Sequence, residues 1–133
     1  MPLHERQALS SFLNNALHGR DIVIQGDGKA IRSYMYAADM VVWLMAILAR
    51  GKHAAAYNVG SDKAVTIAEL AQYVAGISQK NICTHILDKA MQGNAPAIYL
   101  PSLSKIVHNL KNIQNSKFEY ALNRTWEYML RNR

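Results

Sequence analysis

The sequence predicts an α/β chain of helices and short strands, with α+β character when it stands alone. Segments with the apolar period of helices alternate along the chain with short β-branched runs. Half of the 133 residues are hydrophobic, which is enough for one domain with a packed core. We therefore expect a single domain over residues 1–133, without repeats or linkers.

The first expected element is a helix that ends at Gly19, a natural stop. Its apolar residues follow the i, i+3, i+4, i+7, i+8 spacing of a helix with one buried face. They are Leu9, Phe12, Leu13, Ala16 and Leu17.

Two β-rich runs then flank the turn Gly26-Asp27-Gly28. Asp-Gly between such runs is a strong signal for a tight hairpin. The alternative is a dinucleotide-binding loop, which needs a third glycine where Ile31 stands. That loop must also open a helix, whereas "KAIRSYMY" has the composition of a strand. The hairpin is the favoured interpretation.

The run "MVVWLMAILARG" after Asp39 predicts a helix that is apolar on nearly every side and therefore covered by protein all round. A domain of this size would struggle to cover it alone. Its apolar stretch, Met40 to Ala49, is about half of the roughly 20 residues needed to cross a bilayer. The N-terminus lacks the apolar segment of a signal peptide. We expect a cytoplasmic protein without a membrane partner.

The segment "AYNVGS", residues 56–61, is expected to form a short strand. Thr66 and Glu69 then predict a capping box, with Val65 and Leu70 placed as a hydrophobic staple. A helix of about ten residues should follow, to Gly76.

Residues 81–88 predict another strand and residues 91–97 a loop. Ser102 can cap a short helix, and Ser116 with Glu119 predicts a second capping box that opens the last helix. The inward residues of these two helices should be Leu103, Ile106, Val107, Leu110, Phe118, Ala121, Leu122, Trp126 and Met129.

Charge and metal-ligand residues exclude several classes of function. The formal net charge of +6 favours anionic partners, but the basic residues are dispersed and match no nucleic-acid-binding motif. The single cysteine, Cys83, excludes an intrachain disulfide and is expected to be a small buried hydrophobe. The five histidines lack metal-ligand spacing, so we expect no metal site.

Several segments together carry a family resemblance. The most specific are "GDGKAIRSYMYAAD" and, after a short gap, "YNVGS"; "TIAELAQYV", "YLPSLSKIVHNL" and "ALNRTWEYML" follow in order. In order and spacing they resemble the C-terminal half of the NAD-dependent epimerase/dehydratase family, the extended short-chain dehydrogenases that act on nucleotide sugars. The resemblance covers nearly the whole chain.

In that family the N-terminal Rossmann half holds NAD on a three-glycine loop and reacts through a Tyr-x-x-x-Lys pair, while the C-terminal half grips the substrate diphosphate. Neither signature occurs here, since none of the seven tyrosines is followed four residues later by lysine. The resemblance implies a part that binds a nucleoside diphosphate sugar, carries no catalytic residue and holds no NAD by itself. Its apolar helix would pack on a missing Rossmann half or in a homo-oligomer.

The resemblance also implies substrate-binding residues. Arg32 matches the family arginine that contacts the substrate phosphates, and a guanidinium suits that task because it donates two parallel hydrogen bonds. Tyr34 lies on the same strand face. Gln25 matches the place where the family meets the nucleobase. Asp39 is expected to stabilise a helix start, and Asn58 to satisfy backbone groups.

One departure weakens the match. Many family members carry a second arginine before the "YLP"-like segment, but here no arginine occurs between Arg50 and Arg124, and Ile98 stands near that place. Lys89 or another cation would have to substitute. Two other functions remain open: a non-catalytic module for protein association, and a basic nucleic-acid-binding domain.

Overall fold

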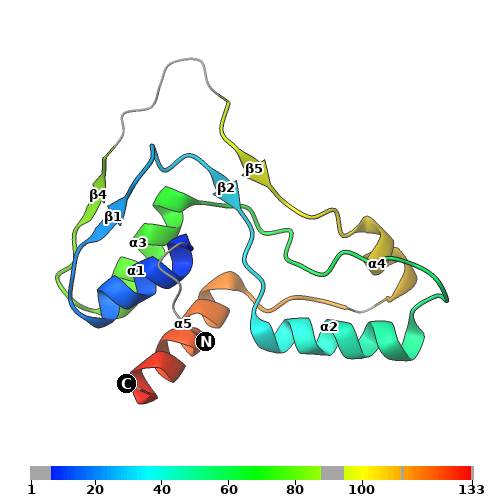
Figure 1. Cartoon of the computed structure of the whole chain (residues 1–133). Coiled ribbons are helices and arrows are strands. Elements are labelled where there is room, and N and C mark those ends of the chain that lie inside the picture. Colours follow the sequence, from blue (N-terminus) through cyan, green and yellow to red (C-terminus); the bar gives the residue numbers. More distant parts are fainter. Residues whose placement is uncertain (1–6, 88–94, 112, 133) are drawn as a thin grey trace.

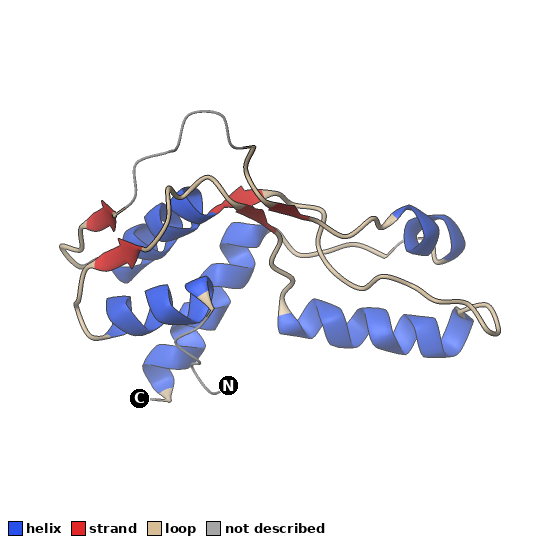
Figure 2. Cartoon of the chain, turned by 45° about the horizontal axis from the view of Figure 1, so that its top comes forward, coloured by secondary structure: helices blue, strands red, loops and turns tan. Residues whose placement is uncertain are grey.

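The structure is a computed structural model that describes residues 7–87, 95–111 and 113–132. Helices and short strands alternate in it, which confirms the predicted α/β class (Figure 1). The elements are α1 (Ala8–Leu17), β1 (Ile22–Ile24), β2 (Ile31–Arg32), α2 (Ala37–Arg50), β3 (Val65–Thr66), α3 (Ile67–Ser78), β4 (Thr84–Ile86), β5 (Ile98–Tyr99), α4 (Ser104–Asn109) and α5 (Phe118–Arg131). Helices α1, α3 and α5 gather at one end of the molecule, and α2 and α4 lie at the other (Figure 2).

The strands form two small sheets. β1 pairs with β4 in parallel, and the second sheet has the order β3-β2-β5. In that second sheet β2 is antiparallel to β3 and parallel to β5. The predicted hairpin is therefore wrong, because β1 and β2 belong to different sheets.

The turn at Gly26 to Gly28 carries the chain from one sheet to the other and packs on the start of α3. Gly28 has a left-handed φ of 74°. Its carbonyl accepts a hydrogen bond from the backbone N–H of Ala68 at 3.0 Å. A Cβ on Gly28 would lie 3.0 Å from that of Ala68. The glycine therefore serves both the turn and the close approach to a helix.

The larger hydrophobic cluster, called here the first core, lies between α1, β1, α3 and α5. Its buried residues are Phe12, Leu13, Ala16, Leu17, Ile22, Ile24, Val65, Leu70, Ala71, Val74, Phe118, Leu122 and Trp126. The predicted capping box of α3 is confirmed: Thr66 Oγ1 accepts from Glu69 N at 3.1 Å, and the Glu69 carboxylate accepts from Thr66 N at 2.8 Å. The apolar period of α1 is also confirmed.

The smaller cluster, called the second core, lies between α2 and α4. It consists of Trp43, Leu103, Ile106, Leu110 and Ile113. The Trp43 indole donates to Gln114 O at 3.3 Å, and the Asp39 carboxylate accepts from both N and Oγ of Ser116 at 2.8 Å. These hydrogen bonds join α2 to the segment that leads into α5.

Two of the predicted helix caps are wrong. The N-cap of α5 is Lys117, without a side-chain cap, because the Ser116 hydroxyl donates to Asp39 instead. The N-cap of α4 is Leu103, and Ser102 Oγ lies 3.2 Å from Ser104 Oγ.

Three further predictions fail for lack of tertiary neighbours. Residues 56–61 form no strand, since no described strand lies beside them to supply ladder hydrogen bonds. Cys83 is exposed rather than buried, because it precedes β4 on an uncovered side of the small sheet. Lys89 and residues 91–94 of the predicted loop lie outside the described residues.

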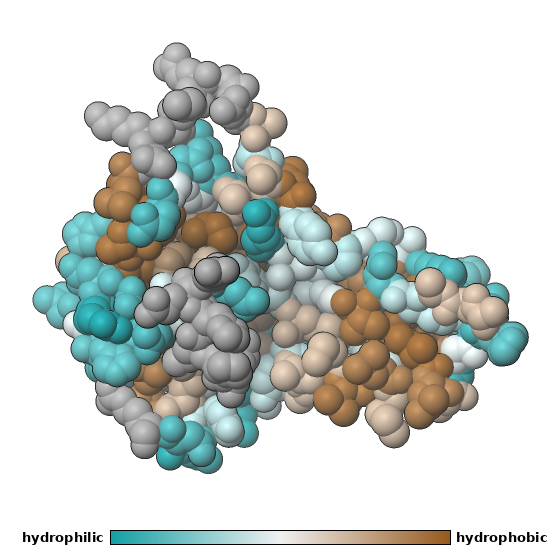
Figure 3. Space-filling view, in the orientation of Figure 1, coloured by the Kyte–Doolittle hydropathy of each residue, from teal (hydrophilic) through white to brown (hydrophobic). Residues whose placement is uncertain are grey.

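Helix α2 is poorly covered, contrary to the expectation that protein surrounds it. Trp43, at 1% exposure, is its buried residue. The other large apolar residues that the solvent reaches are Met40, Val41, Val42, Leu44, Met45 and Leu48. They form a hydrophobic patch over α2 (Figure 3). Among the described residues, no helix combines the length and the hydropathy that crossing a bilayer requires.

Candidate functional site

Strand β2 places Arg32 at the centre of the three-stranded sheet. Its register partners are Val65 on β3 and Tyr99 on β5. Residues in register on neighbouring strands share a face of the sheet. Arg32, itself half-buried, therefore lies between the buried Val65 and Tyr99, which is 75% exposed. The site opens to solvent on the β5 side.

Backbone carbonyls hold the Arg32 guanidinium in place. Its Nη1 atom donates to Ile31 O at 2.8 Å and to Ala97 O at 3.0 Å. Both contacts use one nitrogen, and within the part of the chain that the structure describes the other two nitrogens make no hydrogen bond. A guanidinium carries five N–H donors, so a forked pair remains for an anionic group.

Tyr34 lies two residues after Arg32 and is directed toward the first core. Its ring centroid is 6.3 Å from that of Phe118, in a tilted arrangement. Burial raises the pKa of the Tyr34 phenol, and the nearby positive charge of Arg32 partly opposes that rise. The structure therefore brings Tyr34 and Arg32 together, with the tyrosine ring against Phe118 of α5.

Gln25 lies apart from these two residues. It follows β1, in the other sheet, and is exposed. Among the described residues, no hydrogen bond joins its side chain to Arg32 or Tyr34.

The structure contains two further cavities, one of which is lined by residues that follow β2. A cavity of about 590 Å³ is lined by Ser33 and Met35, which follow β2 in the chain. Tyr99 also borders it, together with residues 57–61.

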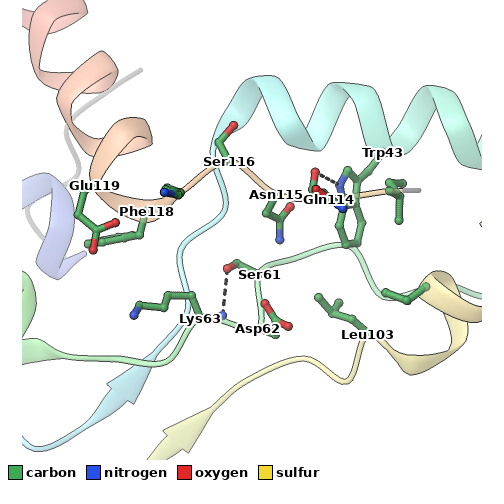
Figure 4. Close-up of a pocket in the computed structure, with 13 residues that line it drawn as sticks. Trp43, Ser61, Asp62, Lys63, Leu103, Gln114, Asn115, Ser116, Phe118 and Glu119 are labelled. Carbon is green, nitrogen blue, oxygen red and sulfur yellow. Dashed lines mark hydrogen bonds between the residues drawn. The ribbon is translucent and has the colours of Figure 1, made fainter. Parts of the chain in front are cut away.

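The second cavity, of about 450 Å³, lies beside the second core (Figure 4). Lys63 and Glu119 lie on one side of it, and Trp43 and Asn115 on the other (Figure 4). The backbone amide of Glu119, the Tyr73 hydroxyl and the charge of Lys63 together lower the pKa of the Glu119 carboxyl. The Tyr73 hydroxyl donates to this carboxylate at 3.1 Å. The Glu119 carboxylate thus already has a hydrogen-bond donor within the chain.

The glycine turn does not fit a dinucleotide. The space that a pyrophosphate would need at Gly28 is filled by Ala68, and β2 follows the turn where a phosphate-binding helix would begin. Within the described ranges, no group of three or more His, Cys, Asp or Glu residues could hold a metal ion.

Sequence reasoning missed Tyr99 as a neighbour of Arg32. The two residues are far apart in the chain and meet because β2 and β5 pair in parallel. No local pattern around either residue encodes that pairing, so only the sheet topology could have found it.

Comparison with protein families matches residues 2–60 to the NAD dependent epimerase/dehydratase family. UDP-glucuronic acid decarboxylase 4 of Arabidopsis thaliana is 32% identical over 74 residues, which are 56% of this chain and 16% of that protein. Human dTDP-D-glucose 4,6-dehydratase is 28% identical over 69 residues, 52% of this chain and 20% of that protein. The matched segments thus span about a fifth of the length of these curated relatives.

Solved structures resemble nearly the whole chain. The Bordetella bronchiseptica enzyme WbmF in complex with NADH has a TM-score of 0.82 and 26% identity, covering 96% of this chain and 37% of that one. The UDP-glucose 4-epimerase of Thermotoga maritima, solved with UDP-glucose, has a TM-score of 0.83. At 21% identity, over 99% of this chain and 42% of that one, it supports the fold alone.

Proposed function

The chain belongs to the NAD-dependent epimerase/dehydratase family, and on that premise we propose that it is the part that binds the diphosphate of a nucleoside diphosphate sugar. A structure of WbmF contains NAD+ and UDP, which supports a uridine nucleotide as the first ligand to test. In this proposal NAD and the reacting groups lie outside the chain. The cytoplasmic location inferred from the sequence stays a prediction.

The observation that supports the proposal is that the Arg32 guanidinium is fixed in place and still has N–H donors to offer. Two carbonyl contacts fix one guanidinium nitrogen, and the remaining donors lie beside the exposed Tyr99. A fixed guanidinium loses little side-chain entropy when it binds, and its fork matches two phosphate oxygens. Arg32 therefore has the geometry for a diphosphate on the face that it shares with Tyr99.

The other two predicted residues have different roles in this proposal. Tyr34 packs on Phe118 and supports the strand beneath Arg32, with its hydroxyl as the group available to a ligand. Gln25 is exposed at the end of β1 and would meet the nucleobase, at the far end of an extended ligand. Its separation from Arg32 makes it the weaker of the two assignments.

The direct test is calorimetric titration of the chain with uridine diphosphate. Arg32→Ala should weaken binding by about 1.5 to 3 kcal/mol, the contribution of a hydrogen bond to a charged group. This is about one to two powers of ten in dissociation constant. Arg32→Lys should recover only part of the affinity, because an ammonium restores the charge but not the fork.

Arg124→Ala is the matched control. Arg124 is exposed on α5 and pairs with Glu127, so its removal should leave the affinity unchanged. Thermal melts should be similar for all variants, since a half-buried arginine adds little to the core. Equal affinities for wild type, Arg32→Ala and Arg32→Lys would refute the proposal.

The non-catalytic alternative has one observation in its favour, the exposed apolar surface of α2. It predicts association without nucleotide binding. The same titration separates the two functions, because a chain that binds no uridine diphosphate but still associates would fit the alternative only.

A further inference from the structure

Strand β2 ends at Arg32, and the chain then crosses to α2 without regular structure. Residues 33–36 belong to neither a helix nor a strand and lead directly into α2. On this side of the strand, side-chain contacts rather than a strand ladder must hold the chain beside Arg32. Two of these contacts are made with residues 116–118, which lead into α5.

The first contact is between aromatic rings. The Tyr34 ring centroid lies 6.3 Å from that of Phe118, the first residue of α5. Phe118 is buried and also meets the Tyr73 ring of α3 at 5.2 Å, edge to face. The charge of Arg32 acts on the Tyr34 phenol, so the guanidinium lies near this ring. The place of Phe118 therefore bears on the side chain that neighbours Arg32.

The second contact is a pair of hydrogen bonds between Asp39 and Ser116. The Ser116 backbone N–H donates to Oδ2 of Asp39 and the Ser116 hydroxyl to Oδ1, both at 2.8 Å. Figure 4 shows Ser116 beside the start of α2. Hydrogen bonds to a charged acceptor are stronger than neutral ones. Since Ser116 is two residues before Phe118, the carboxylate sets where that ring meets Tyr34.

We propose that Asp39 is a positioning residue, which holds the Arg32 guanidinium in place for its anionic ligand. Both carboxylate oxygens of Asp39 are engaged by Ser116, so the residue acts on Arg32 through other side chains. The contacts run from Ser116 to Phe118 and from there to Tyr34, at the end of β2. This inference rests on the proposed function, because it takes a diphosphate as the ligand of Arg32.

The charge of Asp39 predicts the opposite effect on binding. A carboxylate repels an anionic ligand, so loss of its charge alone should strengthen the binding of a diphosphate. Loss of the hydrogen bonds that position Arg32 should instead weaken it. The sign of the change in affinity therefore separates the two roles of Asp39.

The first test is calorimetric titration of Asp39→Ala and Asp39→Asn with uridine diphosphate. Asp39→Ala removes both acceptors and should weaken binding about three- to tenfold, within the range of coupled contacts. Asp39→Asn removes the same charge and is the matched control. Its amide oxygen can accept from the Ser116 N–H and its amide group can donate to the Ser116 hydroxyl, so it should recover most of the affinity.

A double-mutant cycle tests whether Asp39 acts through Arg32. In an Arg32→Ala background, Asp39→Ala should weaken binding no further, because the group that it positions is already absent. An equal loss in both backgrounds would indicate a general structural role and overturn the proposal. Ser116→Ala, which keeps the charge and one hydrogen bond, should give a smaller loss and replaces Asp39→Ala if that variant does not fold.

A measurement without ligand separates this inference from the proposed function. The Arg32 Nη1 protons, which are donated to the carbonyls of Ile31 and Ala97, can be followed by NMR as they exchange with solvent. Asp39→Ala should speed this exchange at least about threefold, through more frequent local opening, and Asp39→Asn should change it little. Unchanged exchange or tighter nucleotide binding in Asp39→Ala would overturn the inference. If the wild type binds no uridine diphosphate, the proposed function falls, and the exchange rates alone decide whether Asp39 positions Arg32.

Discussion

The first and second cores differ in how far the chain completes them. Among the described residues, the first core contains 13 buried residues from helices and strands on several sides, while the second contains five. In the first core, α1, α3 and α5 enclose β1 and Val65 of β3. In the second, α2 meets α4 on one side and solvent on the other.

This difference shows why composition alone overestimates burial. The run in α2 is more apolar than any helix of the first core, yet most of it stays in water. Hydrophobic side chains are buried only where a second layer exists to receive them. The first core provides its own second layer, and the second core lacks one.

The largest expected effect is on the unfolding free energy, when one buried side chain is truncated in each core. Leu70→Ala removes a fully buried leucine from the first core and should cost about 4 kcal/mol of unfolding free energy. Ile106→Ala in the second core should cost about 2 kcal/mol, because the partly solvated surroundings of α4 can collapse into the gap.

Denaturant unfolding measures the loss of unfolding free energy in Leu70→Ala. Hydrogen exchange shows which helices open more readily in each of the two variants. Leu70→Ala should raise exchange throughout α1, α3 and α5, whereas Ile106→Ala should raise it in α2 and α4 only. Leu48→Ala, at an 82% exposed position, is the control and should change the stability little. Uniform exchange after both deletions would mean that the two cores unfold as one unit.

A smaller effect is expected at the turn that attaches β2 to the first core. Gly28→Ala should cost about 1 to 2 kcal/mol, because it forces a left-handed φ and brings a Cβ to 3.0 Å from that of Ala68. Gly26→Ala is the matched control, since nothing lies within 4 Å of the added methyl group. Thermal melts of both variants decide the point. Similar losses at the two glycines would contradict a specific contact with α3.

The smallest effect concerns Asp21 and His85, which flank the sheet of the first core. The Cys83 backbone N–H, and next the His85 ring, lower the pKa of the Asp21 carboxyl below its ordinary value of 3.8. A carboxyl whose pKa is lowered by folding stabilises the fold above its unfolded pKa. That stabilisation is lost as the pH falls from about the ordinary value through the folded pKa.

Carboxyl titration by NMR measures this shift. His85→Ala should raise the Asp21 pKa only part of the way, because the larger cause, the Cys83 N–H bond at 2.9 Å, remains. A full return to the ordinary value would mean that the histidine is the main cause. No such change is expected in the second core, which Asp21 does not contact.

Local patterns predicted well those elements whose stabilising contacts are local. The apolar period of α1 and the Thr66–Glu69 box depend on residues three to four apart, and both were found. The predicted Ser116–Glu119 box is absent because the Ser116 hydroxyl donates instead to Asp39, 77 residues away. The hairpin failed for the same reason, since each strand found its partner in a distant segment.

The candidate site shows the same difference between local patterns, which were predicted, and long-range contacts, which were not. Alternation along a strand predicted that Arg32 and Tyr34 share a face, and the structure brings them together. Tyr99 and Ala97 reach Arg32 through the parallel pairing of β5, which no local pattern reveals. The expected substrate contacts of Arg32, Tyr34 and Gln25 stay predictions until a ligand is titrated.

The parallel pairing of β1 with β4 also sets the order in which a growing chain can fold. Ile22 pairs with Thr84, so β1 must wait for its partner until α2 and α3 have both left the ribosome. Domains fold as units during synthesis, and transiently exposed apolar segments attract chaperones or aggregate. The apolar run of α2 is complete well before β4 emerges and is therefore the segment most exposed to these encounters during translation.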